Sequence, residues 1–171
     1  LYFNPTERVD EGFLQSWHGG GKNWDVITVG SVAQGGDTAE WNALRNYVSG
    51  QNVQLPSVYQ EIERRMDLTN FVDYLILNTY GATWDWPHNN WRAARERATA
   101  GRFRFYVWDA EGAFGFTRST PTFDSFSTTD SGLLPPGSAE IPRFYQGLRN
   151  SPEFRLLWAD RVHKHFFNNG A

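Results

Sequence analysis

Residues 84–112 read WDWPHNNWRAARERATAGRFRFYVWDAEG, and this stretch decides the fold of the chain. It contains two strand-like runs, residues 90–97 and 102–109, separated by the four residues ATAG. A short glycine-containing connection between two such runs predicts a β-hairpin. If the hairpin is symmetric about the middle of the ATAG connection, the register of every cross-strand pair is fixed.

This register brings oxygen donors together. Asn90 is expected directly opposite Asp109, on the same face of the hairpin. An amide and a carboxylate held in this way suit a hard cation such as Mg²⁺ or Mn²⁺. Asp109 also continues an apolar strand face, where a carboxylate is costly to bury unless it is paired or binds a metal. Glu111 is a second candidate ligand, and the alternative for Asp109 is a salt bridge to Arg92 or Arg118.

Asp85 precedes Asn90 by five positions, which gives the pattern D-x-x-x-x-N. In the catalytic loop of protein kinases the Asp of this pattern is the base and the Asn binds a metal. The pattern alone is weak, because Asp73 and Asn78 fit it too; we interpret that pair as helical and reject it. Asp85 lies in a turn, from which a rigid scaffold can project a functional carboxylate. The alternative is that Asp85 only stabilises the turn.

The chain has 171 residues and a formal net charge of −3, which predicts one domain and gives no reason to expect nucleic acid as a partner. It contains no cysteine and no apolar run of about 18 residues, so no membrane span is expected. The eight Trp, seven Tyr and thirteen Phe predict an aromatic-rich core, although exposed Trp could instead stack on sugars. Because the chain opens on Leu1 in a strand-like pattern, we expect it to begin inside a longer protein.

Periodicity and capping predict the remaining elements. We expect strands at 1–3 and 24–29, helices at 38–48, 57–66, 67–81, 139–149 and 151–168, and a long loop over 114–136. The helix capped by Asp67 has the most regular apolar stripe, and we expect one face of the hairpin to pack on it through Leu75 or Ile76. That face carries the pairs Trp91–Trp108 and Ala93–Tyr106. The last helix is expected to bury a stripe from Phe154 to Phe166.

Taken together, several segments resemble the CotH kinase family. They are FVDYLILN at 71–78, WDWPHNNW at 84–91, FRFYVWD at 103–109, SPEFR at 151–155, ADRVHKHFF at 159–167 and TERVD at 6–10. The resemblance covers most of the chain and implies a single CotH-kinase-like domain over residues 1–171. The implied fold is α+β and atypical protein-kinase-like, with a helical lobe, a central metal-binding β-hairpin and a reduced N-terminal lobe.

The resemblance also implies an activity. A protein of this family would use ATP with Mg²⁺ or Mn²⁺ and transfer the γ-phosphoryl group to Ser or Thr of a protein substrate. It would act on a spore coat, cell-surface or secreted protein. Asp85 would be the catalytic base, and Asn90, Asp109 and Glu111 would bind the metal.

One part of the family pattern is missing. The chain has only two lysines, Lys22 and Lys164, and the position nearest to the nucleotide-binding lysine of the family is Asp25. Lys22 or an arginine such as Arg92 would take its place, with Glu7 as the paired glutamate, or the lysine lies outside this chain. This departure predicts a weak or inactive kinase. The alternatives are a catalytically silent scaffold of the same family and a carbohydrate-binding module.

Overall fold

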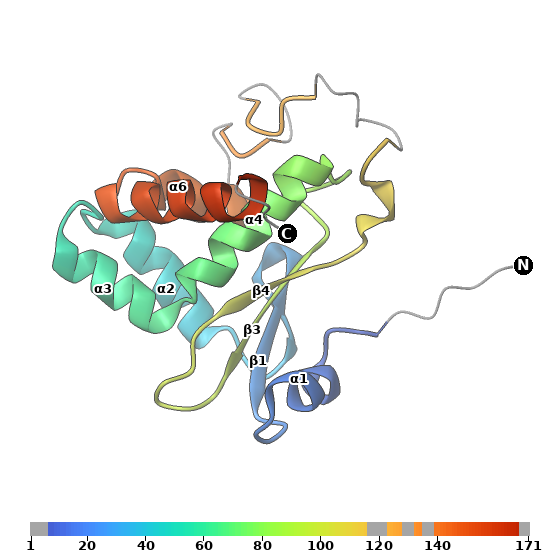
Figure 1. Ribbon diagram of the computed structural model, residues 1–171. Helices are drawn as coiled ribbons and strands as arrows, with labels where there is room; N and C mark the ends of the chain where they lie inside the picture. Colours follow the sequence, from blue (N-terminus) through green and yellow to red (C-terminus); the bar gives the residue numbers. More distant parts are fainter. Residues whose placement is uncertain (1–6, 116–122, 128–131, 135–138, 168–171) are drawn as a thin grey trace, which may run out of the picture.

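The computed structural model describes residues 7–115, 123–127, 132–134 and 139–167. Within these residues the chain forms six α-helices and one four-stranded antiparallel sheet (Figure 1). The elements are α1 (Glu11–His18), β1 (Trp24–Thr28), η1 (Val29–Ser31), β2 (Val32–Gly35), α2 (Ala39–Gly50), α3 (Pro56–Arg65), α4 (Leu68–Gly81), β3 (Trp91–Glu96), β4 (Arg104–Val107), η2 (Ala110–Gly112), α5 (Glu140–Leu148) and α6 (Pro152–Phe166). The expected α+β class is therefore confirmed.

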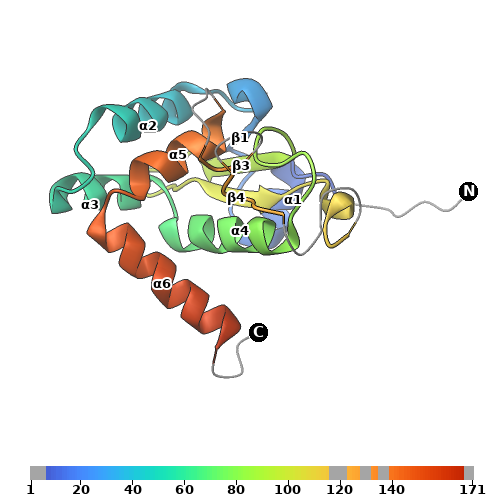
Figure 2. The ribbon, with the colours of Figure 1, turned by 90° about the horizontal axis from the view of Figure 1, so that it is seen from above.

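The sheet has the strand order β2-β1-β3-β4 and separates two unequal layers. Figure 1 shows the sheet between α1 on one side and α2, α3, α4 and α6 on the other. Figure 2 shows α5 beside α2, with α6 leading from the end of α5 along the outside of the helical layer. Among the described residues, no helix is long and apolar enough to cross a membrane.

Alternation along the strands assigns side chains to the two layers. Odd-numbered residues of the hairpin, from Trp91 to Phe105, face the larger core, which is rich in aromatic rings. Trp41 of α2 lies at its centre, stacked on Trp91 at 5.5 Å and edge-on to Phe144 at 5.1 Å. Even-numbered residues such as Ala94 face α1 and a smaller core. The predicted aromatic-rich core is therefore present.

The predicted helices are observed, and the residues predicted to cap their N-termini make the expected hydrogen bonds. Asp67 accepts a hydrogen bond from the backbone N–H of Asn70 at the start of α4, and Ser151 does the same for Phe154 at the start of α6. Pro56 and Pro152 occupy the first positions of α3 and α6, where no N–H is needed. Strand β1 lies where a strand was predicted.

The predicted hairpin register is wrong by one residue. Trp91 pairs with Val107 and Ala93 with Phe105, so the pairs Trp91–Trp108 and Ala93–Tyr106 do not form. Asn90 and Asp109 lie beyond the ends of β3 and β4 and do not face each other in the ladder. The register therefore does not place Asn90 and Asp109 on a common face of the hairpin, because alternation applies only within the paired strands.

The slip has its cause in Phe103. The backbone N–H of Phe103 donates to the carbonyl of Arg65, and its carbonyl accepts from the N–H of Asp67. Phe103 is thus paired with the junction between α3 and α4, not with β3. The connection between the paired strands then runs over residues 97–103, which is an odd number of residues, whereas the predicted turn was even. The register is therefore determined by the backbone pairing of Phe103 with the α3–α4 junction, which is distant in sequence, and not by the local symmetry of the turn.

Two elements were not predicted. Helix α1 lies in a region that was expected to contain only strands and turns, although Asp10 caps it through the N–H of Phe13. Strand β2 is short and half exposed, so it has little apolar pattern. The strand predicted at 1–3 and much of the loop predicted over 114–136 lie outside the described residues.

Helix α6 is less buried than predicted. Phe154 is buried, whereas Leu157, Trp158 and Val162 are only partly covered and Phe166 is 45% exposed. Polar contacts hold the helix instead, since Arg161 and His165 both bind the carboxylate of Asp73 on α4. Asp73 therefore has a structural partner, which agrees with its rejection as a catalytic residue.

Candidate functional site

The turn from Trp84 to Asn90 connects α4 to β3 and carries Asp85. Trp86 anchors it, because this ring is buried and its Nε1–H donates to the hydroxyl of Tyr74 on α4 at 2.7 Å. Both carboxylate oxygens of Asp85 accept from Nδ2 of Asn89, each at 3.0 Å. The Asp85 side chain is thus held in one position on an anchored turn.

Asp109 lies two residues beyond the end of β4, directly before η2. Its backbone is left-handed, with φ of 55°, and this conformation turns the chain away from the strand direction. Asp85 and Asn90 have the same conformation, with φ of 56° and 55°. Asp and Asn tolerate this region better than most residues, but it is still uncommon. Three of the predicted site residues therefore share one unusual backbone conformation.

A glycine allows the turn that carries Asp85 to pack against the segment that carries Asp109. Gly112, at the end of η2, is buried against Trp84, and a Cβ added there would lie 2.7 Å from the Cβ of Trp84. Only a residue without a side chain allows this approach. A second contact joins the segment after β4 to the end of α4, because the N–H of Phe114 donates to the carbonyl of Gly81 at 2.8 Å. The contact brings the charge of Asp85 within range of Asp109.

The carboxyl groups of Asp109 and Glu111 lie next to each other, close enough for a hydrogen bond when one of them is protonated. This bond, with some burial and the negative charges of Glu111 and Asp85, raises the pKa of Asp109 above its usual value of 3.8, while Arg92 opposes the shift. The same bond lowers the pKa of Glu111. Opposite pKa shifts in two neighbouring acids are expected when like charges are held together. A cation bound there would offset the repulsion between them.

Arg92 supplies positive charge next to this pair. Its Nη1 donates to Oγ1 of Thr28 at 2.6 Å and to the carbonyl of Trp91, and its Cζ lies 4.6 Å from the centre of the Trp108 ring. Burial and the nearby charge of Arg8 lower the pKa of Arg92, whereas Asp109 raises it. Arg92 is thus a fixed guanidinium between a second arginine and an acidic pair.

The donor set expected for a metal is only partly assembled. Asp109 and Glu111 provide adjacent carboxylates, whose chemistry fits Mg²⁺ or Mn²⁺. The Nδ2 of Asn90 donates to the carbonyl of Trp84 at 3.4 Å, which leaves its Oδ1, the atom that would bind a metal, unused by this bond. In the described parts of the chain, no three His, Asp or Glu side chains are grouped so that they could hold a metal ion. The carboxylate pair therefore fits a hard cation, whereas the ligand shell is incomplete.

The other predicted nucleotide contacts, Lys22 and Glu7, have other neighbours in the structure. Lys22 lines a cavity of about 410 Å³ beside α1, together with Arg8, Asp10 and Glu11. Glu7 accepts a hydrogen bond from Nε1 of Trp17 at 3.2 Å. Within the described residues no ion pair joins Glu7 to a lysine. Of these predicted residues, the structure groups Asp85, Asp109, Glu111 and Arg92, but not Glu7 and Lys22.

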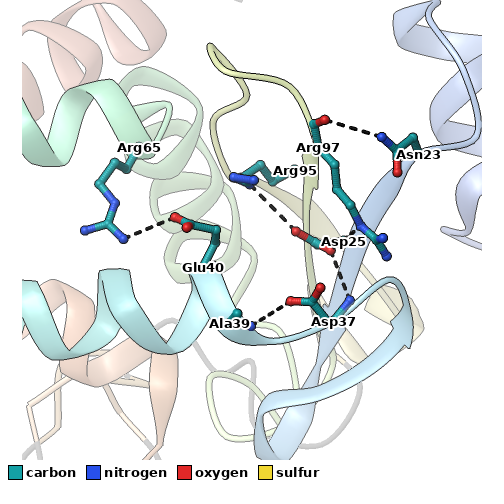
Figure 3. Close-up of polar contacts among 8 residues, drawn as sticks. All are labelled: Asn23, Asp25, Asp37, Ala39, Glu40, Arg65, Arg95 and Arg97. Atoms are coloured by element: carbon teal, nitrogen blue, oxygen red, sulfur yellow. Dashed lines mark hydrogen bonds and ion pairs between the residues drawn. The ribbon is translucent and has the colours of Figure 1, made fainter.

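Asp25, where the family lysine was expected, belongs to another network (Figure 3). Its side chain is only 3% exposed and lies on β1, where it accepts from Nε of Arg97 at 2.7 Å and from the N–H of Asp37 at 3.0 Å. Nε of Arg95 lies 3.8 Å from its other oxygen. Asp25 is thus a buried acid held by two arginines.

Sequence reasoning missed three residues of the site. Trp108 was assigned to the core face, whereas it stacks on Arg92; the correct register would have revealed this. Gly112 follows two acidic positions and looked like an ordinary turn glycine. Arg8 carries no local signal, because only the fold brings it near Arg92.

Comparison with known proteins gives one match. Residues 7–168 match a family model described as CotH kinase protein. Searches of curated proteins and of solved structures found no match.

Proposed function

This chain belongs to the CotH kinase family, and from that premise we propose that it is a metal-dependent kinase-like protein with its site at Asp85, Asp109 and Glu111. The reaction is transfer of the γ-phosphoryl group of ATP to a Ser or Thr hydroxyl of a protein substrate. The observation that carries the proposal is the close approach of Gly112 to Trp84, which joins the segment of Asp109 and Glu111 to the turn that carries Asp85. The fold assigned with it is the kinase-like arrangement of a helical lobe and a central hairpin.

Each residue has a role that its surroundings suit. Asp85 orients the attacking hydroxyl and accepts its proton as the bond from the oxygen to the γ-phosphorus forms. Asp109 and Glu111, assisted by Asn90, would hold Mg²⁺ or Mn²⁺, which supplies positive charge to the phosphates when bound. Arg92 faces negative phosphate oxygens. ADP leaves as the bond between its β-phosphate and the γ-phosphorus breaks.

The backbone supports this assignment. Among the residues that the structure describes, six non-glycine residues have positive φ, and five of them lie from Ala82 to Phe114. Residues in such conformations are costly and concentrate at functional sites. This concentration coincides with the segments that carry Asp85 and Asp109, so two independent features point to the same place.

The division of roles is tested by two variants, Asp109→Asn and Asp85→Asn. Asn tolerates the left-handed backbone of both positions, so the fold is kept. We expect ATP with Mn²⁺ to raise the melting temperature of the Asp85→Asn variant as it does for the unmodified chain, since ligands stabilise what they bind. Asp109→Asn should abolish the increase. Asp85→Asn should lower transfer from labelled ATP to a Ser-rich acceptor by about 10²–10⁴-fold.

The control is Asp160→Asn, which removes one exposed carboxylate on α6 and should change neither measurement. Equal loss of nucleotide binding in the Asp85 and Asp109 variants would mean that the roles are wrongly assigned. An unmodified chain that neither binds ATP nor transfers phosphate would contradict the kinase proposal.

A silent scaffold of the same family is the second candidate, and Asp25 favours it. A buried acid that binds Arg95 and Arg97 provides no positive charge for a phosphate. The carbohydrate-binding alternative has less support, because only Trp17 and Trp84 of the eight tryptophans are exposed. ATP binding without transfer would indicate the scaffold.

A further inference from the structure

A second group of charged side chains surrounds a cavity at the turn end of the β3–β4 hairpin, at the opposite end from Asp109. The cavity has a volume of about 230 Å³. It is lined by Arg64, Arg65, Arg95, Glu40, Phe103 and three residues of the turn. Three guanidinium groups therefore line it with a single carboxylate. The volume accommodates a phosphate group together with several water molecules.

Arg95 is buried without a full set of acceptors. Its side chain is 15% exposed, and its Nε has no hydrogen-bond acceptor among the described residues. The nearest carboxylate oxygen belongs to Asp25 at 3.8 Å, which is too long for a hydrogen bond. Arg97 takes the other oxygen of Asp25 at 2.7 Å. Arg95 is thus a mostly buried cation whose Nε lacks a hydrogen-bond acceptor.

Arg65 is also weakly held. Its side chain is 15% exposed, and Nη2 lies 3.3 Å from Oε2 of Glu40, whose own side chain is half exposed. Figure 3 shows the Arg65 guanidinium directed at Glu40 and the Arg95 guanidinium directed at Asp25. Arg64, at the rim, makes two short hydrogen bonds to Glu61. Glu40 is therefore the one acidic group in the lining, and an entering anion competes with it.

We propose that this cavity binds a phosphomonoester anion. A guanidinium group presents a rigid fork of N–H donors that matches phosphate oxygens. Arg65 and Arg95 line the cavity from α3 and β3, and Arg64 adds charge at its opening. The proposal concerns a different part of the fold from the acidic site and does not depend on phosphoryl transfer.

The probes are inorganic phosphate and a short phosphoserine peptide, each titrated by calorimetry into the full chain. The unphosphorylated peptide is the blank. We expect Arg65→Gln to weaken phosphate binding by about tenfold or more, which is typical for the loss of a hydrogen bond to a charged group. Arg64→Gln should weaken it less, because Arg64 is exposed and paired.

Two further variants distinguish a built site from general attraction. Arg102→Gln removes the same charge from an exposed arginine that follows the turn and does not line the cavity, and it should leave affinity unchanged. Glu40→Gln removes the competing carboxylate and should tighten binding by about two- to fivefold, the range expected for a partly exposed ion pair. Melting curves of all variants check that the fold is kept.

The source of the phosphate follows from the relative affinities. Tighter binding of the phosphopeptide than of inorganic phosphate identifies a phosphorylated side chain as the ligand, and the reverse identifies free phosphate; both support the site. No binding of either probe overturns the proposal. So does binding that Arg65→Gln and Arg102→Gln weaken equally, or that Glu40→Gln fails to strengthen.

Discussion

At the scale of single residues, the acidic pair is the feature that constrains the chemistry most. Asp109 and Glu111 are neighbouring acids whose interaction raises the pKa of Asp109 and lowers that of Glu111. Asp85 adds a third negative charge nearby. A divalent cation would offset the repulsion among these carboxylates, which is the physical reason to propose a binding site here.

This arrangement predicts a pH dependence of Mn²⁺ binding. The raised pKa of Asp109 means that protons compete with the metal at a higher pH than they would for an ordinary aspartate. Affinity should therefore be full at neutral pH and should fall as the pH is lowered, before ordinary carboxylates titrate. Calorimetric titration with Mn²⁺ between about pH 3 and pH 8 covers both ranges.

The Glu111→Gln variant tests the cause of this dependence. It removes one ligand and lowers affinity at neutral pH, but it also removes the charge that raises the pKa of Asp109. The fall in affinity should then occur at a lower pH than in the unmodified chain. An identical pH profile in both proteins would show that Glu111 does not set the protonation of Asp109.

Asp25 gives a second prediction at this scale. Restoring a lysine by Asp25→Lys should not produce an active kinase, because the new cation would lie between Arg95 and Arg97 with no acid to pair them. Breaking a buried ion pair typically costs about 3–5 kcal/mol in the free energy of unfolding. Urea denaturation measures the loss, and Glu63→Lys, an equal charge change on the exposed face of α3, should cost less than about 0.5 kcal/mol. A stable Asp25→Lys variant with faster transfer would contradict this expectation.

At the scale of elements, the site depends on how two connections pack. The turn before β3 and the segment after β4 come together only because Gly112 is small enough to lie on Trp84. Neither Gly112 nor Trp84 has a proposed catalytic or metal-binding role, yet their contact sets the distance between Asp85 and Asp109. Positioning of this kind has large effects, since a misplacement of about 1 Å can cost about 10² in rate.

Gly112→Ala should therefore impair function without touching an acidic residue. The added methyl group would lie 2.7 Å from the Cβ of Trp84, so one of the two segments must move. We expect transfer to fall by about 10²-fold and the free energy of unfolding to fall by about 1–3 kcal/mol. Gly50→Ala is the matched control, because nothing lies within 4 Å of a Cβ at that position. Unchanged transfer in Gly112→Ala would mean that this contact does not position the site.

The same scale explains what could be predicted from the sequence. Helices α4 and α6 were predictable because Asp67 and Ser151 are local signals at their first residues. The hairpin was predictable as an element, but its register depends on Phe103, whose backbone pairs with the α3–α4 junction. A contact of that kind has no local signature. Asn90 and Asp109 were proposed from the hairpin pattern and Asp85 from the D-x-x-x-x-N spacing, whereas the packing of their segments depends on left-handed backbone and on Gly112.

At the scale of the whole molecule, the two charged sites lie at opposite ends of one hairpin. The end that carries Asp109 has acidic groups and Arg92, and the turn end has the arginine-lined cavity. Asp25 belongs to the turn end through Arg95 and Arg97. The position expected to contact the nucleotide is therefore used to stabilise the other end of the sheet, and the acidic site is left with Arg92 as its fixed cation.

This distribution of charge predicts a chain that binds nucleotide better than it transfers phosphate. Loss of one preorganised positive group typically costs on the order of 10²–10³ in rate. Protein kinases commonly turn over at about 1–100 per second, so we expect on the order of 10⁻³ to 1 per second here. The measurement is transfer from labelled ATP, with Mn²⁺, to a Ser-rich acceptor by the 171-residue chain.

Two variants show whether the measured transfer requires Asp85 and Arg92. Asp85→Asn gives the background rate, because it removes the base and keeps the Asp109–Glu111 pair. Arg92→Met removes the remaining fixed cation while keeping an unbranched side chain over Trp108, and it should weaken ATP binding as well as transfer. Transfer at ordinary kinase rates that Asp85→Asn abolishes would contradict the prediction and would mean that Arg92 and Arg8 complete the site. Slow transfer that requires both Asp85 and Arg92 would confirm it, because the base would then be competent and the missing positive charge would limit the rate.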